Sequence, residues 1–145
     1  MARNHRTRSK TKFGNCFAHV LQILRSHELD FPHRIPGHAL ANKDNWNEAI
    51  GFYQTVLRAR PDYIKAHNNL GVALAITGKT DDAVAQFREA LQIDADFADA
   101  HANLGHLFLQ LGQRDQAAAE LRETLRFKPD DAEVKDQLFQ LEFKK

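Results

Sequence analysis

The chain has 145 residues, of which 43% are hydrophobic and 27% charged, and its formal net charge is +1. These values are typical of a globular domain that can bury a core, and they favour no particular class of partner. The single cysteine, Cys16, excludes an internal disulfide and a thiolate-rich metal site. No apolar run approaches the roughly 20 residues that a membrane-spanning helix needs.

The first 27 residues form a basic segment. They carry six Lys or Arg and no acid, whereas residues 28–145 carry 14 Lys or Arg against 19 acids. Apolar side chains at helical spacing predict an amphipathic helix here that packs on the next element. A secretory signal, an organelle transit peptide and a membrane-surface helix are alternatives, but no cleavage pattern follows, and we expect a cytoplasmic location. The apolar residues are Phe13, Phe17, Val20, Leu21 and Leu24.

Residues 28–63 predict an incomplete pair of helices. Pro32 and Pro36 each remove a backbone donor and clash with the preceding turn, so no ordinary helix can run through them. Only residues 37–43 and 45–63 follow the pattern of the later chain. We therefore expect a degenerate first unit.

Residues 64–97 and 98–131 are two copies of a 34-residue repeat. They agree at 13 of 34 positions without a gap, and the hexapeptide AHNNLG at 66–71 returns as AHANLG at 100–105. A fixed period of this length indicates stacked supersecondary units.

Each unit predicts two helices. In the first unit, a helix from about Tyr63 to Thr77 stops at Gly78, which can adopt a left-handed backbone, and a second helix runs from Thr80 to about Ile93. An aspartate before each first helix is expected to be its N-cap. These aspartates are Asp62, Asp96 and Asp130.

Small residues are expected where the two helices of a unit cross. Gly71 and Gly105 lie in the first helices, and Ala83 and Ala117 are expected to face them from the second helices. A larger side chain would force the helices apart, at a typical cost of about 1 to 3 kcal/mol.

Residues 132–145 predict one more helix. Val134, Leu138 and Leu141 share one face, and polar residues fill the others. This is typical of the end helix that solvates the open side of a stack of repeats. Because about three repeats are needed for stability, self-association is an alternative way to cover the degenerate first unit.

These units resemble the tetratricopeptide repeat (TPR) family over about residues 37–131, with histidine in place of the opening aromatic residue. The resemblance implies an all-α, right-handed antiparallel helix-pair solenoid with a C-terminal capping helix, acting as a protein-interaction module. The AHxNLG units are similar to the superhelical repeats of O-linked N-acetylglucosamine transferases, which implies binding of a protein and not sugar chemistry. The residues that match the family pattern are Leu70, Gly71, Ala83, Phe87, Leu104, Gly105, Ala117 and Pro129.

The first helices of such a solenoid line its concave groove. Asn69 and Asn103 are expected to stack there, and because an amide both donates and accepts, they suit the main chain of an extended peptide. A clamp for a terminal carboxylate is disfavoured, since Lys65 is the only cation among the eight residues expected in the groove. These eight are Lys65, Asn68, Asn69, Val72, Asp99, Ala102, Asn103 and His106.

Neither catalysis nor a metal or other cofactor is predicted. The candidate Ser and Cys nucleophiles, Ser9, Ser26 and Cys16, all lie in the basic segment. His67 and His101 are expected to be packed and hydrogen-bonded between helices. One spacing approaches that of a zinc finger but has a single thiolate, and nearby prolines deny its second pair a helix. It comprises Cys16, His19, His33 and His38.

Two other functions stay open from the sequence. The chain could be an accessory or truncated TPR region of a glycosyltransferase-like system, with the activity in another polypeptide. Alternatively, the basic segment attaches it to nucleic acid or to an anionic membrane, and this binding would collapse with salt. The basic residues concerned are Arg3, Arg6, Arg8, Lys10 and Lys12.

Overall fold

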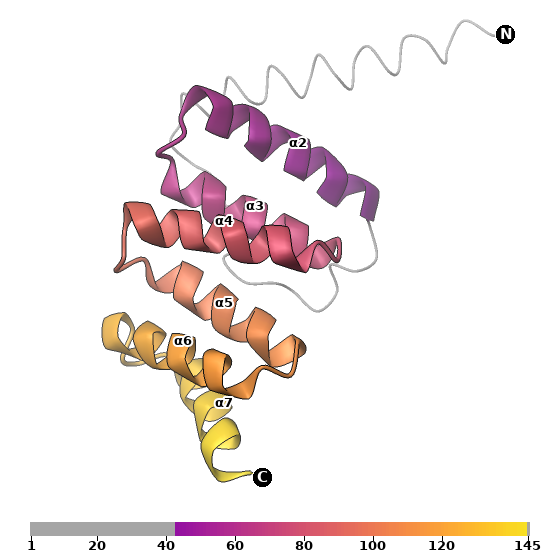
Figure 1. The fold of residues 1–145 in the computed structure, drawn as a ribbon. Helices are drawn as coiled ribbons and strands as arrows, with labels where there is room; N and C mark the ends of the chain where they lie inside the picture. The colour runs from indigo at the N-terminus through magenta and orange to yellow at the C-terminus, as the bar shows by residue number, and fades with distance from the viewer. Residues whose placement is uncertain (1–42, 145) are drawn as a thin grey trace, which may run out of the picture.

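The computed structural model describes residues 43–144, with side chains from Trp46 onward. The amphipathic helix predicted within residues 13–24, the zinc-finger-like spacing and the basic segment lie outside this range. The described residues form six α-helices and no strand (Figure 1). In chain order these are α2 (Lys43–Ala59), α3 (Ile64–Ile76), α4 (Thr80–Ile93), α5 (Ala98–Gln110), α6 (Arg114–Phe127) and α7 (Ala132–Phe143).

The helices stack as antiparallel pairs. α3 packs on α4 and α5 packs on α6, and the two pairs meet mainly through α4 and α5. α2 covers the α3 end of the stack and α7 covers the α6 end, so neighbours in the chain are neighbours in space (Figure 1). The predicted all-α solenoid of helix pairs is confirmed.

The first helix of each unit stops at a glycine with a left-handed backbone. Gly78 has a φ of +82° and Gly112 a φ of +71°, a region that residues with a side chain adopt at a cost. Behind Gly78 the turn closes through a bond from Lys79 N to Leu74 O at 2.9 Å, and the second unit repeats this bond at 2.8 Å. The predicted stop at Gly78 is confirmed, and α4 has the predicted bounds.

The helix starts differ from the predicted aspartate caps by one position. Among the N-cap residues of α3, α5 and α7, only that of α7, Asp131, forms a side-chain hydrogen bond to its helix. Its carboxylate accepts from Val134 N at 3.2 Å. Before α3 the loop closes first, through a bond from Tyr63 N to Arg60 O, and this moves the cap past the aspartate. The observed N-cap residues are Tyr63, Phe97 and Asp131 in place of Asp62, Asp96 and Asp130.

The closest approach within each pair joins a glycine to one large side chain. A Cβ built on Gly71 would lie 2.6 Å from the Phe87 ring, and one built on Gly105 would lie 2.7 Å from the Leu121 side chain. Phe87 and Leu121 have no exposed surface. The glycines are therefore needed for the crossing, as predicted.

The alanines predicted at the crossing are also fully buried. Ala83 and Ala117 have no exposed surface, and the carbonyl oxygen of Ala117 would lie 3.5 Å from a Cβ on Gly105. The nearest side chains over the glycines, however, are the phenyl ring and the leucine described above. The small alanines let the backbone of the second helix approach, while the large side chains fill the space over the glycine.

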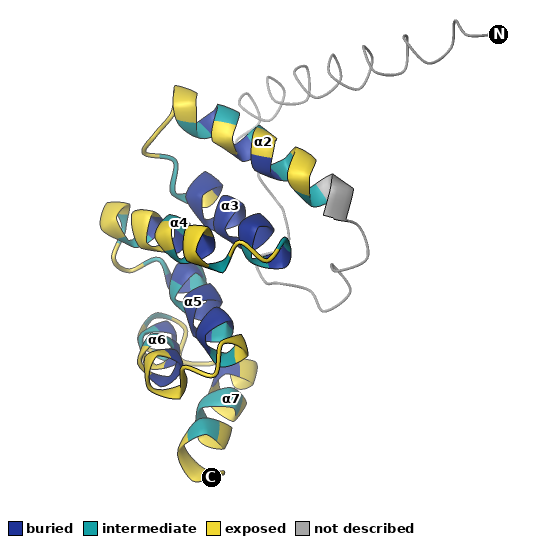
Figure 2. Cartoon of the chain, turned by 45° about the vertical axis from the view of Figure 1, so that its right-hand side comes forward, coloured by how far each residue is buried: buried dark blue, intermediate teal, exposed yellow. Residues whose placement is uncertain are grey.

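Burial divides the stack into an inner and an outer part. α3 and α5 are buried along most of their length, whereas α2, α4 and α6 each expose one face (Figure 2). The fully buried large apolar or aromatic side chains come from every helix except α3, whose Leu70 is 3% exposed, so the core is continuous along the stack. They are Tyr53, Val56, Phe87, Leu104, Leu107, Leu121 and Val134.

The end helix α7 is held by packing and by a cap from α6. Val134 is fully buried. Arg114, the first residue of α6, donates from Nη2 to the carbonyl oxygens of Leu141 and Lys144, at 2.9 and 3.0 Å. These oxygens have no partner within the helix, so the guanidinium satisfies its C-terminal end.

α7 departs from the repeat at the glycine position. Continuing the 34-residue period from Gly71 and Gly105 leads to Phe139, which is 55% exposed. Its ring centroid lies 4.8 Å from that of Phe143, which is 69% exposed. α7 therefore carries an aromatic side chain where the first helices of the two units have none.

Candidate functional site

All eight residues predicted to line the groove lie on the inner helices α3 and α5, but burial separates them. Lys65 is the only exposed residue among them, and Asp99 and His106 are partly buried. Asp99 forms an ion pair with Lys128, which follows the end of α6. The other five are buried: Asn68, Asn69, Val72, Ala102 and Asn103.

The asparagines tie the units together. Asn103 Nδ2 donates to Asn68 Oδ1 at 2.9 Å, and these side chains are 0% and 1% exposed. Asn103 is thus bonded to Asn68, the residue before its predicted stacking partner Asn69. Buried amides need partners, and this pair joins α3 to α5 directly. The peptide-binding role of the asparagines stays a prediction.

Asn69 acts on the neighbouring helix α2 instead. Burial raises the pKa of the Tyr53 hydroxyl, and the Asn69 side chain lowers it in part. Tyr53 is 1% exposed, so this hydroxyl stays protonated and the amide serves a buried polar group. The side-chain amides of α3 and α5 thus interact with buried polar groups of the core.

His67 bridges three parts of its unit. Its Nε2 lies 2.8 Å from the carbonyl oxygen of Pro61, in the loop before α3, and its Nδ1 lies 2.8 Å from Gln86 Oε1 on α4. The carbonyl oxygen can only accept, so Nε2 carries a proton. The predicted packed and hydrogen-bonded histidine is confirmed here.

His101 repeats this arrangement with a charged partner. Its Nδ1 lies 2.7 Å from Glu120 Oε2 and its Nε2 lies 3.0 Å from the carbonyl oxygen of Ala95. Both partners can only accept, which favours a doubly protonated ring. The hydrogen bond to Glu120 is the main cause that raises the pKa of His101; burial opposes it, and the Ala95 carbonyl and the charges of Glu120 and Glu123 add to it.

A hollow of about 290 Å³ opens at the junction of α5, α6 and α7. The Oε1 atom of Gln137 is buried and has no hydrogen-bond partner, while its Nε2 donates to Glu133 Oε1 at 3.3 Å. Arg114 and Lys144 supply positive charge at the wall. The hollow is lined by Leu109, Arg114, Gln137, Gln140, Leu141 and Lys144.

Residues 132–145 were predicted only as a capping helix, so the residues of α7 that line this hollow were missed. The 34-residue period would have found two of them. Gln137 follows Asn103 by one period, and Gln140 follows His106 by one period. The polar positions of the inner face therefore continue into the end helix.

Residues 43–144 show neither the geometry of a metal site nor that of a membrane-spanning helix. No group of three or more His, Cys, Asp or Glu side chains in this range is arranged to hold a metal ion. None of its helices combines the length and apolar character needed to cross a membrane. The candidate nucleophiles and the basic residues between Arg3 and Lys12 lie outside the described range.

Stacked helix pairs with a glycine-to-large-residue crossing define a helical-repeat solenoid, and the chain belongs to the tetratricopeptide repeat family. Two models of this family, each described as a tetratricopeptide repeat, match residues 37–97 and 74–138. Together they cover most of the chain and both full units. Among curated proteins, no sequence matches.

Solved TPR domains have a similar fold. The Arabidopsis OM64 TPR domain has a TM-score of 0.65 at 23% identity, covering 72% of this chain and 87% of that one. The first TPR of Spaghetti (RPAP3), bound to the HSP90 peptide SRMEEVD, has a TM-score of 0.64 at 19% identity, covering 77% and 95%. The first TPR domain of human RPAP3, determined by NMR, has a TM-score of 0.63 at 20% identity, covering 71% and 88%. At these identities the likeness concerns the fold.

Proposed function

We propose that this chain is a non-catalytic protein-interaction module whose inner face binds an extended segment of a partner protein. The observation that carries the proposal is the hollow at the junction of α5, α6 and α7, with the buried and unpartnered Oε1 atom of Gln137 in its wall. A buried acceptor without a partner costs free energy, and once the Gln137 side chain turns toward the hollow, the amide N–H of a bound peptide would satisfy it.

The chemistry around this atom suits a polypeptide. Gln140 stands one helical turn after Gln137, so side-chain amides are spaced along the hollow. Amides can meet both the N–H and the C=O groups of an extended main chain. Leu109 and Leu141 add apolar contact, which side chains of any sequence can use.

The known neighbours support a peptide ligand in general terms. One structurally similar TPR domain was solved with an HSP90 peptide. In this chain, Lys65 is the only cation among the predicted groove positions. Arg114 already donates to two carbonyl oxygens at the end of α7. We therefore propose recognition of a main chain, with less weight on a terminal carboxylate.

The test should change the inner face without disturbing the core. Asn103 is a poor choice, since it is fully buried and bonded to Asn68. Gln140 and Lys144 are exposed and line the hollow. The double variant Gln140→Glu, Lys144→Glu places negative charge there and should abolish capture of partner proteins, read by crosslinking in native lysate and mass spectrometry.

A matched control lies on the outer face of α4. Arg88 and Gln92 are exposed and have the same four-residue spacing, so Arg88→Glu, Gln92→Glu makes comparable changes of charge. This control should capture the same proteins as the wild type. If the inner-face variant also captures them unchanged, the partner binds elsewhere and the proposal is wrong.

A further inference from the structure

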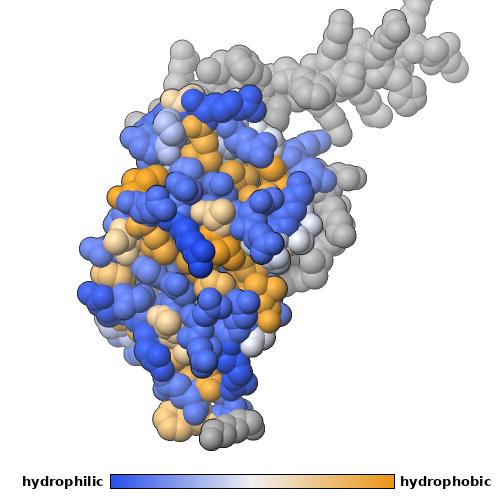
Figure 3. Space-filling view, viewed as in Figure 1, coloured by the Kyte–Doolittle hydropathy of each residue, from blue (hydrophilic) through white to orange (hydrophobic). Residues whose placement is uncertain are grey.

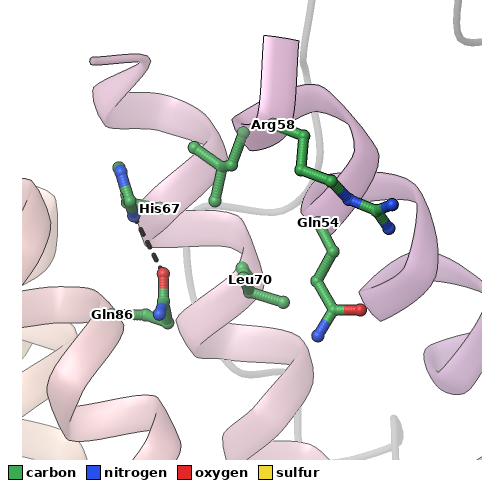
Figure 4. A pocket seen from close by; sticks show the side chains of 6 residues that line it. Gln54, Arg58, His67, Leu70 and Gln86 are labelled. Atoms are coloured by element: carbon green, nitrogen blue, oxygen red, sulfur yellow. Dashed lines mark hydrogen bonds between the residues drawn. The ribbon is translucent and has the colours of Figure 1, made fainter. Parts of the chain in front are cut away.

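A second hollow, of about 420 Å³, lies on the outer side of the stack at the junction of α2, α3 and α4. Polar groups dominate this side of the molecule, with apolar groups visible between them (Figure 3). Gln54 and Arg58 stand on one side of Leu70, and His67 and Gln86 stand on the other (Figure 4). The hollow is lined by Gln54, Leu57, Arg58, His67, Leu70 and Gln86.

The polar groups available in this hollow favour an anion. Arg58 is exposed and forms no ion pair within the described part of the chain. Gln54 is exposed beside it and can donate from its amide. None of the described lining residues is acidic, so the charge of the guanidinium is unopposed at the wall.

The opposite wall is neutral because of the bond between His67 and Gln86. The two nitrogens of His67 are engaged by Gln86 and by the carbonyl oxygen of Pro61, 2.8 Å away in each case. Gln86 is an uncharged partner, so neither side chain brings a negative charge toward the hollow. The floor between the walls is apolar, from Leu57 and Leu70.

The next unit provides a natural comparison at the corresponding positions. Thirty-four residues later, Gln92 takes the place of Arg58 and Glu120 takes the place of Gln86. There the cation at this position is lost and a carboxylate stands in the wall, bonded to His101. The charge pattern that favours an anion therefore belongs to the first junction and not to the repeat as such.

We propose that this outer hollow binds the side-chain carboxylate of a glutamate in a partner protein. The planar guanidinium of Arg58 can donate two parallel bonds to a carboxylate, and the Gln54 amide can add a third. Leu57 and Leu70 can contact the methylene groups of the glutamate. This site lies outside the groove of the proposed function and does not depend on it.

The test is an NMR titration of the full chain with a blocked alanine heptapeptide that carries one central glutamate. Saturable shifts should appear at millimolar peptide on the side-chain N–H groups of Arg58, Gln54 and Gln86. Arg58→Gln, which copies the next unit, should weaken the association about tenfold through loss of the charge-assisted bonds.

Two controls make the outcome decisive. Arg88→Gln removes the same charge from an exposed position of α4 that does not line the hollow, and it should leave the association unchanged. A peptide with glutamine in place of glutamate should cause no saturable shift. The proposal is overturned if the two peptides bind equally, if Arg88→Gln weakens binding as much as Arg58→Gln, or if no shift is seen. Because Arg58 is exposed, its variant should stay folded, which a circular dichroism spectrum checks.

Discussion

The two full units have the same backbone plan and differ in what surrounds it. In both, a left-handed glycine ends the first helix and a second glycine lies under a large side chain. The side chain over the glycine is Phe87 in the first unit and Leu121 in the second, and the histidine partner is Gln86 in the first and Glu120 in the second. The repeat therefore constrains the size of the side chains at the helix crossing and leaves the charge beside the histidine free to vary.

The largest difference between the units should follow from the side chain over the glycine. Phe87→Ala should lower the free energy of unfolding by about 4 kcal/mol, and Leu121→Ala by about 3 kcal/mol, because both are fully buried and the ring fills more space. Urea denaturation followed by circular dichroism measures both. Ile93→Ala, at an exposed position of α4, is the control and should change little. Equal losses in the two units would show that the crossings are packed alike.

The glycines beneath these side chains should respond in the same order. Gly71→Ala should destabilise by about 2 kcal/mol, since its Cβ would meet a rigid ring, and Gly105→Ala by about 1 kcal/mol, since the leucine side chain can turn aside. The same denaturation measures the two variants. The double variant Gly71→Ala, Phe87→Leu should recover part of the loss. If Gly105→Ala is less stable than Gly71→Ala, the explanation that the ring yields less than the leucine side chain is wrong.

The bond between the units can be measured with a double-mutant cycle. Asn68→Ala or Asn103→Ala alone leaves a buried amide without its partner, and each should cost about 1 to 3 kcal/mol. The double variant should cost less than the sum of the two, with a coupling of about 1 kcal/mol. Additive losses would mean that the bond contributes no stability of its own to the joint between α3 and α5.

The smallest expected effect is a pH dependence of stability that comes from His101 and its carboxylate partner Glu120. Because folding raises the pKa of His101, its protonation stabilises the fold at low pH, and this contribution is lost as the pH rises through the folded-state pKa. Between about pH 6 and pH 8, the wild type should therefore lose more stability than Glu120→Gln, which copies the partner of His67. Thermal or urea unfolding across this pH range measures the difference. The same slope in both proteins would exclude the carboxylate as its cause.

The sequence predicts the helices well because their limits depend on local chemistry. Gly78 and the apolar period place α4 correctly and place α3 to within one residue at each end. The caps were less predictable, because a backbone bond in the loop before α3 shifts its start past Asp62. That bond depends on the course of the whole loop, which a capping pattern does not contain.

The contacts of the predicted groove residues on α3 and α5 were only partly predictable, because they also depend on more than local sequence. A period locates a residue along the stack but does not give the rotation of one helix against the next. That rotation brings Asn103 to Asn68 instead of Asn69 and buries the pair. The same period, continued into α7, would have identified Gln137 and Gln140, so this part of the candidate site was within reach of the sequence.

Phe139 has a consequence for building longer arrays from this chain. In both units the second helix lies on a bare glycine, and Phe139 occupies that place on α7. If a copy of residues 80–93 were fused behind α7, its large side chain would collide with this ring. Phe139→Gly should remove this collision. Only the chain that carries both the fused helix and Phe139→Gly should gain helix content and unfold as a larger cooperative unit. One aromatic side chain thus limits how far this array can be extended by simple duplication.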